Sequence, residues 1–463
     1  MKPSISIPQG TRDFSPVVVR KRQYILNTLR TIFERYGFQP LETPSMENLT
    51  TLMGKYGEEG DRLIFKVLNN GLHEKKEADK AELNKEWEKI LSKPYSSKTV
   101  TERALRYDLT IPFARYVAMN HNELALPFRR YQMQPVWRAD SPQRGRYREF
   151  WQCDCDVVGS TSLLNEAELL CIYQSAFHEL KLPQVTVKIN SRKLLAALAE
   201  VCGAPEQMME ITIALDKLDK IGWEKVAAEL AARGISAEGI SAIEKIIAIK
   251  GTNEEQLTAL DAVLGSTEMG KAGIAELKKT LSYHKALADT SWDSQVVIDI
   301  SLARGLNYYT GVIVEVTTGA VKMGSIGGGG RYDDLTGLFG VKGLSGVGVS
   351  FGIDRIYDVL DELKLFPEML VAGTKVMLVN FGGDDEAYAL QVLQQLRKNN
   401  IAAELYPEAA KFDKQMKYAN KRELPFVMIV GEKERQEQKV SLKNFTTGEQ
   451  HLLSVDEAVK QLT

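Results

Sequence analysis

The sequence predicts an α+β protein of several domains, and three observations predict it. A chain of 463 residues is long enough for two to four domains, each with its own core. Strand-like runs at 127–158, 296–300 and 311–317 are interrupted by a helix-rich stretch from about 191 to 284. From residue 376 onward, strand and helix patterns alternate, which is typical of a small α/β domain.

Residues 17–36 predict a long amphipathic helix. Their apolar residues recur at the i, i+3, i+4, i+7 spacing of one helix face, and Gly37 follows where a C-cap is expected. Pro40 and Pro44 then predict an extended segment near a sheet edge, because proline cannot donate to a sheet ladder. The apolar residues that follow this spacing are Ile25, Leu29, Ile32, Phe33 and Tyr36.

Residues 71–93 are about half charged, with both signs mixed. This pattern predicts a solvated helix inserted between two more apolar segments. We expect no function there.

Residues 105–116, LRYDLTIPFARY, leave two interpretations open. Asp108 and Thr110 lie two apart, so they share a face if the segment is extended. Alternatively, Asp108 caps a helix in the segment that follows Pro112. Spacing alone does not separate these interpretations.

Residues 127–158 predict a β-hairpin that concentrates arginine. Six arginines fall between 129 and 148 with Asp140 as the one acid, and Pro142 and Gly145 suit the turn. Alternation predicts an apolar face and a polar face. The polar side chains either face water or form a site, and arginine beside Gln and Asp favours bidentate recognition of phosphate and carboxylate. The predicted polar face carries Arg130, Gln132, Gln134, Arg138, Arg146, Arg148, Gln152, Asp154 and Asp156.

Three short segments follow the helix-rich stretch. In LARGLNYYTG, residues 302–311, we expect a strand that ends at Arg304 and two tyrosines after it, in a site or in the core of an ordinary hairpin. GSIGGGGRYDDL, residues 324–335, lacks the features of a phosphate loop, and its glycines favour close approach of a ligand to the backbone. GVGVSFGIDRI, residues 346–356, predicts a strand of small residues before a helix.

The C-terminal region predicts a small α/β domain with a mainly parallel sheet. Its order is β-α-β-α-β. The predicted strands are 376–381, 402–406, 426–431 and 440–445, and the predicted helices are 384–399 and 412–422.

Composition excludes several classes of protein. Lys and Arg number 59 against 61 Asp and Glu, so bulk charge predicts no partner. Four cysteines are too few for a disulfide scaffold, and Cys153 and Cys155 lack zinc-ribbon or redox spacing, which favours reduced thiols. The sequence shows neither a signal peptide nor an apolar run long enough to span a membrane. We expect a cytoplasmic protein with no membrane partner.

The order of the segments resembles one family. TRDFSP with GFQPLETP, the arginine hairpin and GVGVSFGIDRI resemble the three signature motifs of class II aminoacyl-tRNA synthetases. LRYDLT, LARGLNYYTG and GGGGRYDDL resemble segments of the histidyl-tRNA synthetase family, and LPFVMIVGEKE with KVSLKNFTTGEQ resembles its anticodon-binding domain. The match covers nearly the whole chain.

The resemblance implies a mostly antiparallel sheet flanked by helices, an inserted helical domain and a C-terminal α/β anticodon-binding domain. It implies domains at 1–190 with 290–365, at 191–289 and at 372–463. It also implies a homodimer that makes histidyl-adenylate from histidine and ATP with Mg²⁺, then charges tRNA(His). The metal ligands stay unassigned.

The resemblance also implies roles for single residues. Arg138 would hold the α-phosphate of ATP, and Arg146 and Arg355 the distal phosphates. Arg304 would lie against the α-phosphate near the histidine carboxylate. No side chain needs to act as a nucleophile. In the histidine site, Asp108, Thr110 and Gln152 would bind the α-ammonium and fix the carboxylate, Asp156 and Tyr309 would contact the imidazole nitrogens, and Tyr308 and Tyr332 would close the pocket.

Two departures and two alternatives accompany this interpretation. Asn307 stands where the family usually has Asp, which removes a negative charge beside Arg304, and the insert at 71–93 lengthens the chain before LRYDLT. One alternative is a catalytically inactive paralogue that senses histidine or uncharged tRNA. Another is a class II synthetase for a different amino acid, which LARGLNYYTG argues against.

Overall fold

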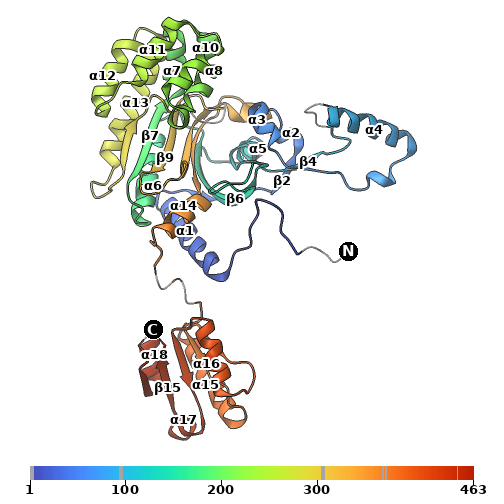
Figure 1. Ribbon diagram of the computed structural model, residues 1–463, viewed down its shortest axis with the longest axis vertical. Helices are drawn as coiled ribbons and strands as arrows, with labels where there is room; N and C mark the ends of the chain where they lie inside the picture. The colour runs from blue at the N-terminus through green and yellow to red at the C-terminus, as the bar shows by residue number, and fades with distance from the viewer. Residues whose placement is uncertain (1–4, 93–96, 304–307, 368–369, 371–372, 446) are drawn as a thin grey trace. The chain divides into compact units, whose positions relative to one another are not determined.

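The structure is a computed structural model, and two compact units make up the chain (Figure 1). It describes residues 5–92, 97–303, 308–367, 370, 373–445 and 447–463. One unit lies within residues 1–13 and 22–365, and the other within residues 14–21 and 366–463. Among the described residues, no helix is both long and apolar enough to cross a membrane.

The first unit is built on an eight-stranded sheet of described residues, in the order β1-β5-β6-β11-β10-β9-β7-β8. Its strands pair antiparallel except for β1 with β5 and β7 with β8, at the two edges. The predicted mostly antiparallel sheet is therefore confirmed. The strands are β1 (Gln39–Pro40), β5 (Phe128–Trp137), β6 (Glu149–Val158), β7 (Val185–Ser191), β8 (Gln295–Ile298), β9 (Val312–Thr318), β10 (Gly327–Asp333) and β11 (Ser345–Gly352).

The apolar face of this sheet is covered by two helices, α1 (Pro16–Arg35) and α6 (Leu164–Glu179). Phe33 of α1 lies 5.7 Å from Phe351 of β11, measured between ring centroids, and Tyr173 of α6 lies 4.5 Å from the same ring. The N-terminal helix ends as predicted, and Gly37 has a φ of +77°, which glycine adopts without strain. The predicted helix, its C-cap and the edge position of Pro40 are confirmed.

A second, three-stranded sheet lies in the same unit, in the order β2-β4-β3. Helix α4 (Glu77–Ser92) belongs to this region, and none of its residues, all of which the structure describes, is buried. The predicted solvated helix is confirmed. The other elements of the region are β2 (Met46–Asn48), α2 (Leu49–Leu52), α3 (Gly57–Arg62), β3 (Lys66–Val67), η1 (Leu72–Glu74), β4 (Arg103–Leu105) and α5 (Thr110–Asn120).

The predicted helix-rich stretch between β7 and β8 is confirmed (Figure 1). The expected strand ending at Arg304 is wrong, because β8 ends at Ile298 and the Leu302 amide donates to the Asp299 carbonyl at 2.9 Å, which turns the chain. The elements of the stretch are α7 (Arg192–Val201), η2 (Pro205–Gln207), α8 (Met208–Leu215), α9 (Leu218–Ile221), α10 (Trp223–Ala232), α11 (Ala237–Ile247), α12 (Asn253–Leu264) and α13 (Glu268–Leu287). Helices η3 (Leu335–Phe339) and α14 (Ile353–Glu362) lie beyond it.

The second unit has a five-stranded sheet of described residues in the order β13-β12-β14-β15-β16. The mainly parallel sheet we expected is wrong, because β14 with β15 and β15 with β16 pair antiparallel. The six-residue α17 is too short for the crossover of a dozen or more residues that parallel pairing requires. The elements are β12 (Val376–Leu378), α15 (Gly383–Lys398), β13 (Ala403–Leu405), α16 (Phe412–Lys421), β14 (Phe426–Ile429), α17 (Glu432–Glu437), β15 (Lys439–Asn444), β16 (Gln450–Ser454) and α18 (Val455–Leu462).

Candidate functional site

Polar side chains of β5 and β6 share one face of the large sheet with glycines of β10 and β11. In one cross-strand row, Gln132 pairs with Asp154, Asp154 with Ser350, and Ser350 with Gly328. The polar half of the row supplies hydrogen-bonding groups, whereas Gly328 places no side chain over the sheet. This leaves room above the backbone, as the glycine-rich sequence predicts.

The neighbouring row repeats the arrangement with Arg130, Asp156, Gly348 and Gly330. A Cβ atom at Gly348 would overlap the Asp156 carboxylate, so only glycine fits beside it. At Gly330, a Cβ atom would lie 3.1 Å from the Tyr309 ring. The Tyr309 ring therefore lies directly over the glycine end of this row.

The polar face of the hairpin is buried. Arg130 and Gln132 are 0 % exposed, and Asp154 and Asp156 are 2 % exposed. The interpretation that places this face in water is therefore wrong for these four residues. Alternation correctly assigned the two faces, but it carries no information about whether other parts of the chain cover the polar one.

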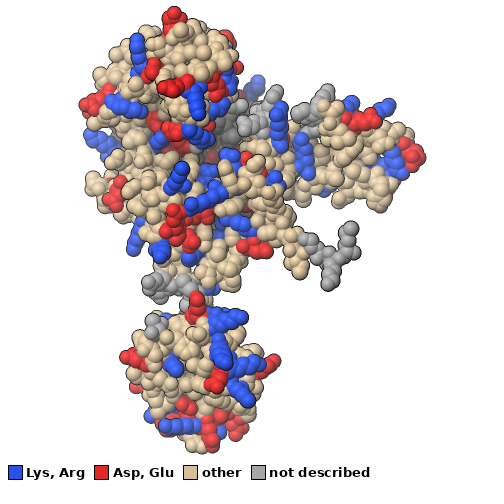
Figure 2. Space-filling model, viewed as in Figure 1, with Lys and Arg blue, Asp and Glu red and all other residues tan. Residues whose placement is uncertain are grey.

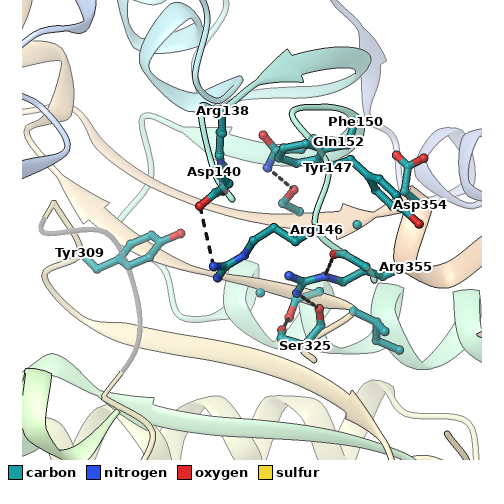
Figure 3. A pocket seen from close by; sticks show the side chains of 16 residues that line it. Arg138, Asp140, Arg146, Tyr147, Phe150, Gln152, Tyr309, Ser325, Asp354 and Arg355 are labelled. Atoms are coloured by element: carbon teal, nitrogen blue, oxygen red, sulfur yellow. Dashed lines mark hydrogen bonds and ion pairs between the residues drawn. The ribbon is translucent and has the colours of Figure 1, made fainter. Parts of the chain in front are cut away.

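A cavity of about 280 Å³ opens on this face of the sheet (Figure 3). Arg138, Arg146 and Arg355 contribute three guanidinium groups to its lining, against the carboxylates of Asp140 and Asp354. The cavity is therefore suited to an anionic ligand. Its lining residues are Arg138, Asp140, Gly145, Arg146, Tyr147, Phe150, Gln152, Tyr309, Ser325, Ile326, Gly327, Gly328, Ser350, Gly352, Asp354 and Arg355.

Arg138 is fixed at the end of β5. Its Nε donates to the Tyr107 carbonyl at 3.0 Å. Its guanidinium lies 4.3 Å from the Tyr107 ring centroid and 5.1 Å from that of Phe150. Backbone and aromatic contacts thus orient the side chain without neutralising its charge.

Arg355 and Arg146 come from different elements. Arg355, at the start of α14, donates from Nε to the Gly145 carbonyl at 2.7 Å and from a terminal nitrogen to the Ser325 carbonyl at 2.6 Å. It therefore connects the hairpin turn to the segment before β10. Arg146 lies 3.8 Å from an Asp140 oxygen, in a looser ion pair (Figure 3).

Asp354 is a residue of the cavity lining that was not predicted from the sequence. Its carboxylate accepts from Arg22 at 2.5 Å, from Arg12, and from the Trp151 backbone amide at 2.9 Å. It therefore links the N-terminal segment, the hairpin and α14, and it places Arg355 beside the cavity. The only sequence signal was an acid in the first turn of a helix. The other lining residues that the analysis missed include Tyr147, Phe150, Ser325 and Ser350.

Gln152 presents an acceptor to the cavity. Its Nε2 donates to Ser350 Oγ at 2.9 Å. Its Oε1 is buried and has no hydrogen-bond partner among the described residues. An unpaired buried carbonyl oxygen in a cavity wall is a natural contact for a ligand that donates N–H groups.

Asp108 belongs to a buried group at the start of α5. Its Oδ1 accepts from the Tyr56 hydroxyl at 2.8 Å and from the Ile111 amide at 3.2 Å, and its Oδ2 lies 3.4 Å from the Tyr308 hydroxyl. Burial raises the pKa of the Asp108 carboxyl, and the hydrogen bond from Tyr56 opposes that shift. The helix begins at Thr110, so Asp108 satisfies a helix N-terminal amide, and the extended interpretation is wrong.

Asp156 lies below the tyrosines. Its Oδ1 accepts from the Tyr332 hydroxyl at 2.7 Å, and its Oδ2 lies 2.8 Å from Arg130. Burial raises the pKa of Asp156, and Arg130 opposes that shift. Burial also raises the pKa of Tyr309 and of Tyr332, so both hydroxyls keep their protons and can donate.

Some of the expected site residues line the cavity, some belong to the buried groups around Asp108 and Asp156, and two lie outside the described residues. Five line the cavity: Arg138, Arg146, Gln152, Tyr309 and Arg355. The Tyr308 ring centroid lies 5.0 Å from that of Tyr309 and 6.1 Å from that of Tyr332, which joins the Asp108 group to the Asp156 group. Thr110 is the first residue of α5, two positions after Asp108. Arg304 and Asn307 lie outside the described residues.

Comparisons with known proteins agree on one family. A family model described as histidyl-tRNA synthetase matches residues 79–356, and a model described as an anticodon binding domain matches residues 375–463. A histidine–tRNA ligase of Phocaeicola vulgatus is 53% identical over 451 residues, covering 97% of each chain.

Solved structures give the same result. A crystal structure of histidyl-tRNA synthetase from Nostoc sp. superposes with a TM-score of 0.82 at 31% identity, covering 99% of this chain and 100% of that one. A Bacillus halodurans structure described as an ATP phosphoribosyltransferase regulatory subunit/histidyl-tRNA synthetase reaches a TM-score of 0.70 at 20% identity, covering 90% of this chain and 97% of that one. At that identity the second likeness shows the fold alone.

Proposed function

The chain belongs to the histidyl-tRNA synthetase family, and from this premise we propose how its own residues carry out the reaction of a histidine–tRNA ligase. As an aminoacyl-tRNA ligase, it joins the histidine carboxylate to the α-phosphate of ATP and releases diphosphate. It then transfers the histidyl group to the 3′ end of tRNA(His) and releases AMP. The observation that carries our assignment is the arginine-lined cavity over the glycine end of the sheet.

Adenylate formation is limited by repulsion between the carboxylate and the phosphates and by their alignment. We assign the α-phosphate to Arg138, whose guanidinium is held by a carbonyl and two rings but keeps its charge. We assign the distal phosphates to Arg146 and Arg355, which also line the cavity. These side chains bind and neutralise charge, and none of them acts as a nucleophile.

We propose that histidine lies between the cavity and the tyrosines. Gln152 Oε1 is an unpaired acceptor suited to the α-ammonium, and Asp108 adds a negative charge on the Tyr308 side. Asp156 and Tyr309 would contact the two imidazole nitrogens, since a carboxylate accepts an N–H and a hydroxyl both donates and accepts. Tyr308, Tyr332 and Thr110 would close and support this pocket.

Arg304 stays a proposal from the family motif. We assign it to the α-phosphate near the histidine carboxylate, with Asn307 in place of the usual acid beside it. Both residues lie outside the described part of the chain.

Magnesium does not fit a protein-bound site in the described residues. They contain no group of three or more His, Cys, Asp and Glu able to hold a metal. In the cavity, Asp354 is engaged by Arg12 and Arg22, and Asp140 lies beside Arg146. We propose that Mg²⁺ enters as the counter-ion of the ATP phosphates, as part of the substrate.

We propose that residues 1–190 and 290–365 form the catalytic domain, 191–289 an inserted helical domain and 372–463 the anticodon-binding domain. On α16, Lys414, Lys417 and Lys421 are exposed, and the preceding Lys411 is exposed too. Figure 2 shows Lys and Arg side chains gathered over α15 and α16 on the face drawn, which supports phosphate contacts with tRNA(His). A homodimer and a cytoplasmic location are further proposals, taken from the family.

The test is ATP–pyrophosphate exchange with each of the twenty amino acids in turn. We expect exchange that depends on histidine alone. Exchange with another amino acid would contradict the substrate, and absence of exchange in a folded protein that binds histidine would favour the inactive sensing paralogue.

A further inference from the structure

Arg12 is a cation beside the cavity to which the proposed reaction gives no role. It lies in the segment before α1 and does not line the cavity, but it contacts two residues that do, Tyr147 and Asp354. Its guanidinium carbon lies 3.3 Å from the centroid of the Tyr147 ring, and a terminal nitrogen donates to Asp354 Oδ1. Figure 3 shows these two lining side chains beside each other. Arg12 therefore lies directly behind the part of the wall that they form.

The segment that carries Arg12 is held against the hairpin by its backbone. The Arg148 amide donates to the Gly10 carbonyl at 2.9 Å. Gly10 has a φ of +83°, and a Cβ atom there would lie 2.7 Å from the Arg148 side chain, so this approach requires glycine. The amide and hydroxyl of Thr11 donate to the Pro8 carbonyl at 3.1 and 2.7 Å, which closes a turn. These contacts hold Arg12 at the cavity wall.

Asp354 is the carboxylate next to an arginine that we assign to the distal phosphates of ATP. It is 3 % exposed and immediately precedes Arg355 in the chain. Without a counter-charge, a carboxylate in this wall would repel a polyphosphate. Arg12 and Arg22 both bind Oδ1, Arg22 at 2.5 Å, so two positive charges face one negative charge. Arg12 therefore reverses the sign of the charge at this end of the cavity.

The same contacts fix the start of α14. Asp354 Oδ2 accepts from the Trp151 amide of β6 at 2.9 Å, while Oδ1 is held by Arg12 and Arg22. One turn further along α14, Asp358 accepts from the Tyr147 hydroxyl at 3.0 Å. Arg12 thus contacts both residues through which these hydrogen bonds join the hairpin to α14.

We propose that Arg12 is a positioning residue for the distal phosphates of ATP: it neutralises Asp354 and holds the start of α14, so that Arg355 faces the phosphates. This inference rests on the proposed function, which assigns those phosphates to Arg146 and Arg355. Arg12 acts through Asp354 and Arg355, not through a phosphate contact of its own.

The experiment compares two nucleotides that differ in the distal phosphates alone. Dissociation constants of ATP and AMP are measured by isothermal titration calorimetry, with Mg²⁺ present, for the full-length wild type and for Arg12→Gln. We expect ATP to bind about tenfold weaker to the variant and AMP to change less than about twofold. In the exchange assay the Michaelis constants for ATP and diphosphate should rise, and that for histidine should change less than about twofold.

A second change separates positioning from a general loss of structure. Asp354→Asn removes the negative charge that Arg12 neutralises and keeps an oxygen that can accept a hydrogen bond. The double variant of Arg12→Gln with Asp354→Asn should therefore bind ATP at least about threefold more tightly than Arg12→Gln alone. Two independent structural lesions would instead add. Arg12→Lys, which keeps the charge, should bind ATP within about threefold of the wild type, and it carries the test if the double variant does not fold.

Arg129→Gln is the matched control. Arg129 lies on β5, forms an ion pair with Glu168, and has a side chain 27 % exposed, against 26 % for Arg12. It does not line the cavity. Binding of ATP and of AMP should stay within about twofold of the wild type.

Equal weakening of ATP and AMP by Arg12→Gln would overturn the proposal, because it would show a structural role, and so would unchanged binding of ATP. Weaker binding of ATP to the double variant than to Arg12→Gln would also overturn it. Arg355→Gln tests the premise, since a loss that is not selective for ATP would contradict the assignment of the distal phosphates. A wild-type protein that binds ATP without histidine-dependent exchange would contradict the proposed function but leave the comparison of ATP with AMP decisive for Arg12.

Discussion

Asp156 forms a buried ion pair with an arginine and accepts a hydrogen bond from a tyrosine. Its Oδ2 lies 2.8 Å from Arg130, and its Oδ1 accepts from Tyr332 at 2.7 Å. Arg130 is 0 % exposed, so it has no access to water if its partner is lost. We therefore expect Asp156 to affect stability and, in its proposed role, histidine selection.

Replacing Asp156 with Ala should raise the Michaelis constant for histidine by about a hundredfold or more and change that for ATP little. The same change should lower the free energy of unfolding by about 3–5 kcal/mol, because it leaves Arg130 charged and unpaired. Asp156→Asn should be intermediate at most for histidine. Exchange kinetics and urea unfolding check the two effects, and an equal effect on both substrates would remove Asp156 from the imidazole pocket.

Asp154 predicts how stability depends on pH. Burial raises the pKa of its carboxyl from 3.8 to about 7 in the folded chain. Between about pH 4 and pH 7 the folded state thus holds the proton more tightly than the unfolded state. The stabilisation is present at low pH and is lost as the pH rises through about 7.

The asparagine of Asp154→Asn never ionises. The difference in free energy of unfolding, variant minus wild type, should therefore increase as the pH rises through that window, by up to about 1.4 kcal/mol per pH unit. Groups that titrate alike in both proteins cancel in the difference. Urea unfolding of both proteins across the window measures it, and a difference independent of pH would contradict the assignment.

Helix α4 contributes no buried residue to the fold. Replacing Glu77–Ser92 by a short flexible linker should leave histidine-dependent exchange within about twofold and the free energy of unfolding nearly unchanged, since little apolar area is lost from a core. Loss of exchange in a folded deletion variant would show that α4 supports the catalytic sheet.

The exposed lysines of α16 predict a dependence on salt. Lys414→Gln with Lys417→Gln should raise the Michaelis constant for tRNA(His) and lower the slope of log affinity against log salt by roughly 0.7–0.9 for each lost phosphate contact. Exchange without tRNA should not change. Lys433→Gln, an exposed lysine of α17, is the control. An unchanged salt slope in the double variant would exclude α16 from the tRNA surface.

The division into two units predicts that activation of histidine and charging of tRNA can be separated. Every lining residue of the cavity belongs to the first unit, and the second unit has its own core around Val376, Leu378, Val392 and Leu442. A chain that ends at Leu365 should keep histidine-dependent exchange within about threefold and lose most tRNA charging, because the anticodon contacts supply binding energy for tRNA alone. Steady-state charging with purified tRNA(His) measures this, and charging at the full rate would contradict it.

Local pattern was enough to predict several elements of the chain. The 3.6-residue repeat gave the N-terminal helix to within one residue at each end, and period-two alternation assigned the two faces of the hairpin. Both predictions were correct because helix and strand periodicity depend only on residues that are close in sequence. The order of the motifs was enough to predict the family, because several independent segments occur in one sequence order.

Contacts between distant segments were decided by the tertiary structure alone. Arg12 and Asp354 are 342 positions apart, and no spacing rule connects them. Whether the polar face of the hairpin meets water and which of its arginines reach the cavity both depend on what packs over the sheet. The C-terminal sheet also depends on the tertiary structure. Helix α17 is too short for a crossover, so β15 pairs antiparallel with β14. Alternation states which side chains share a face, and only the folded chain determines what that face contacts.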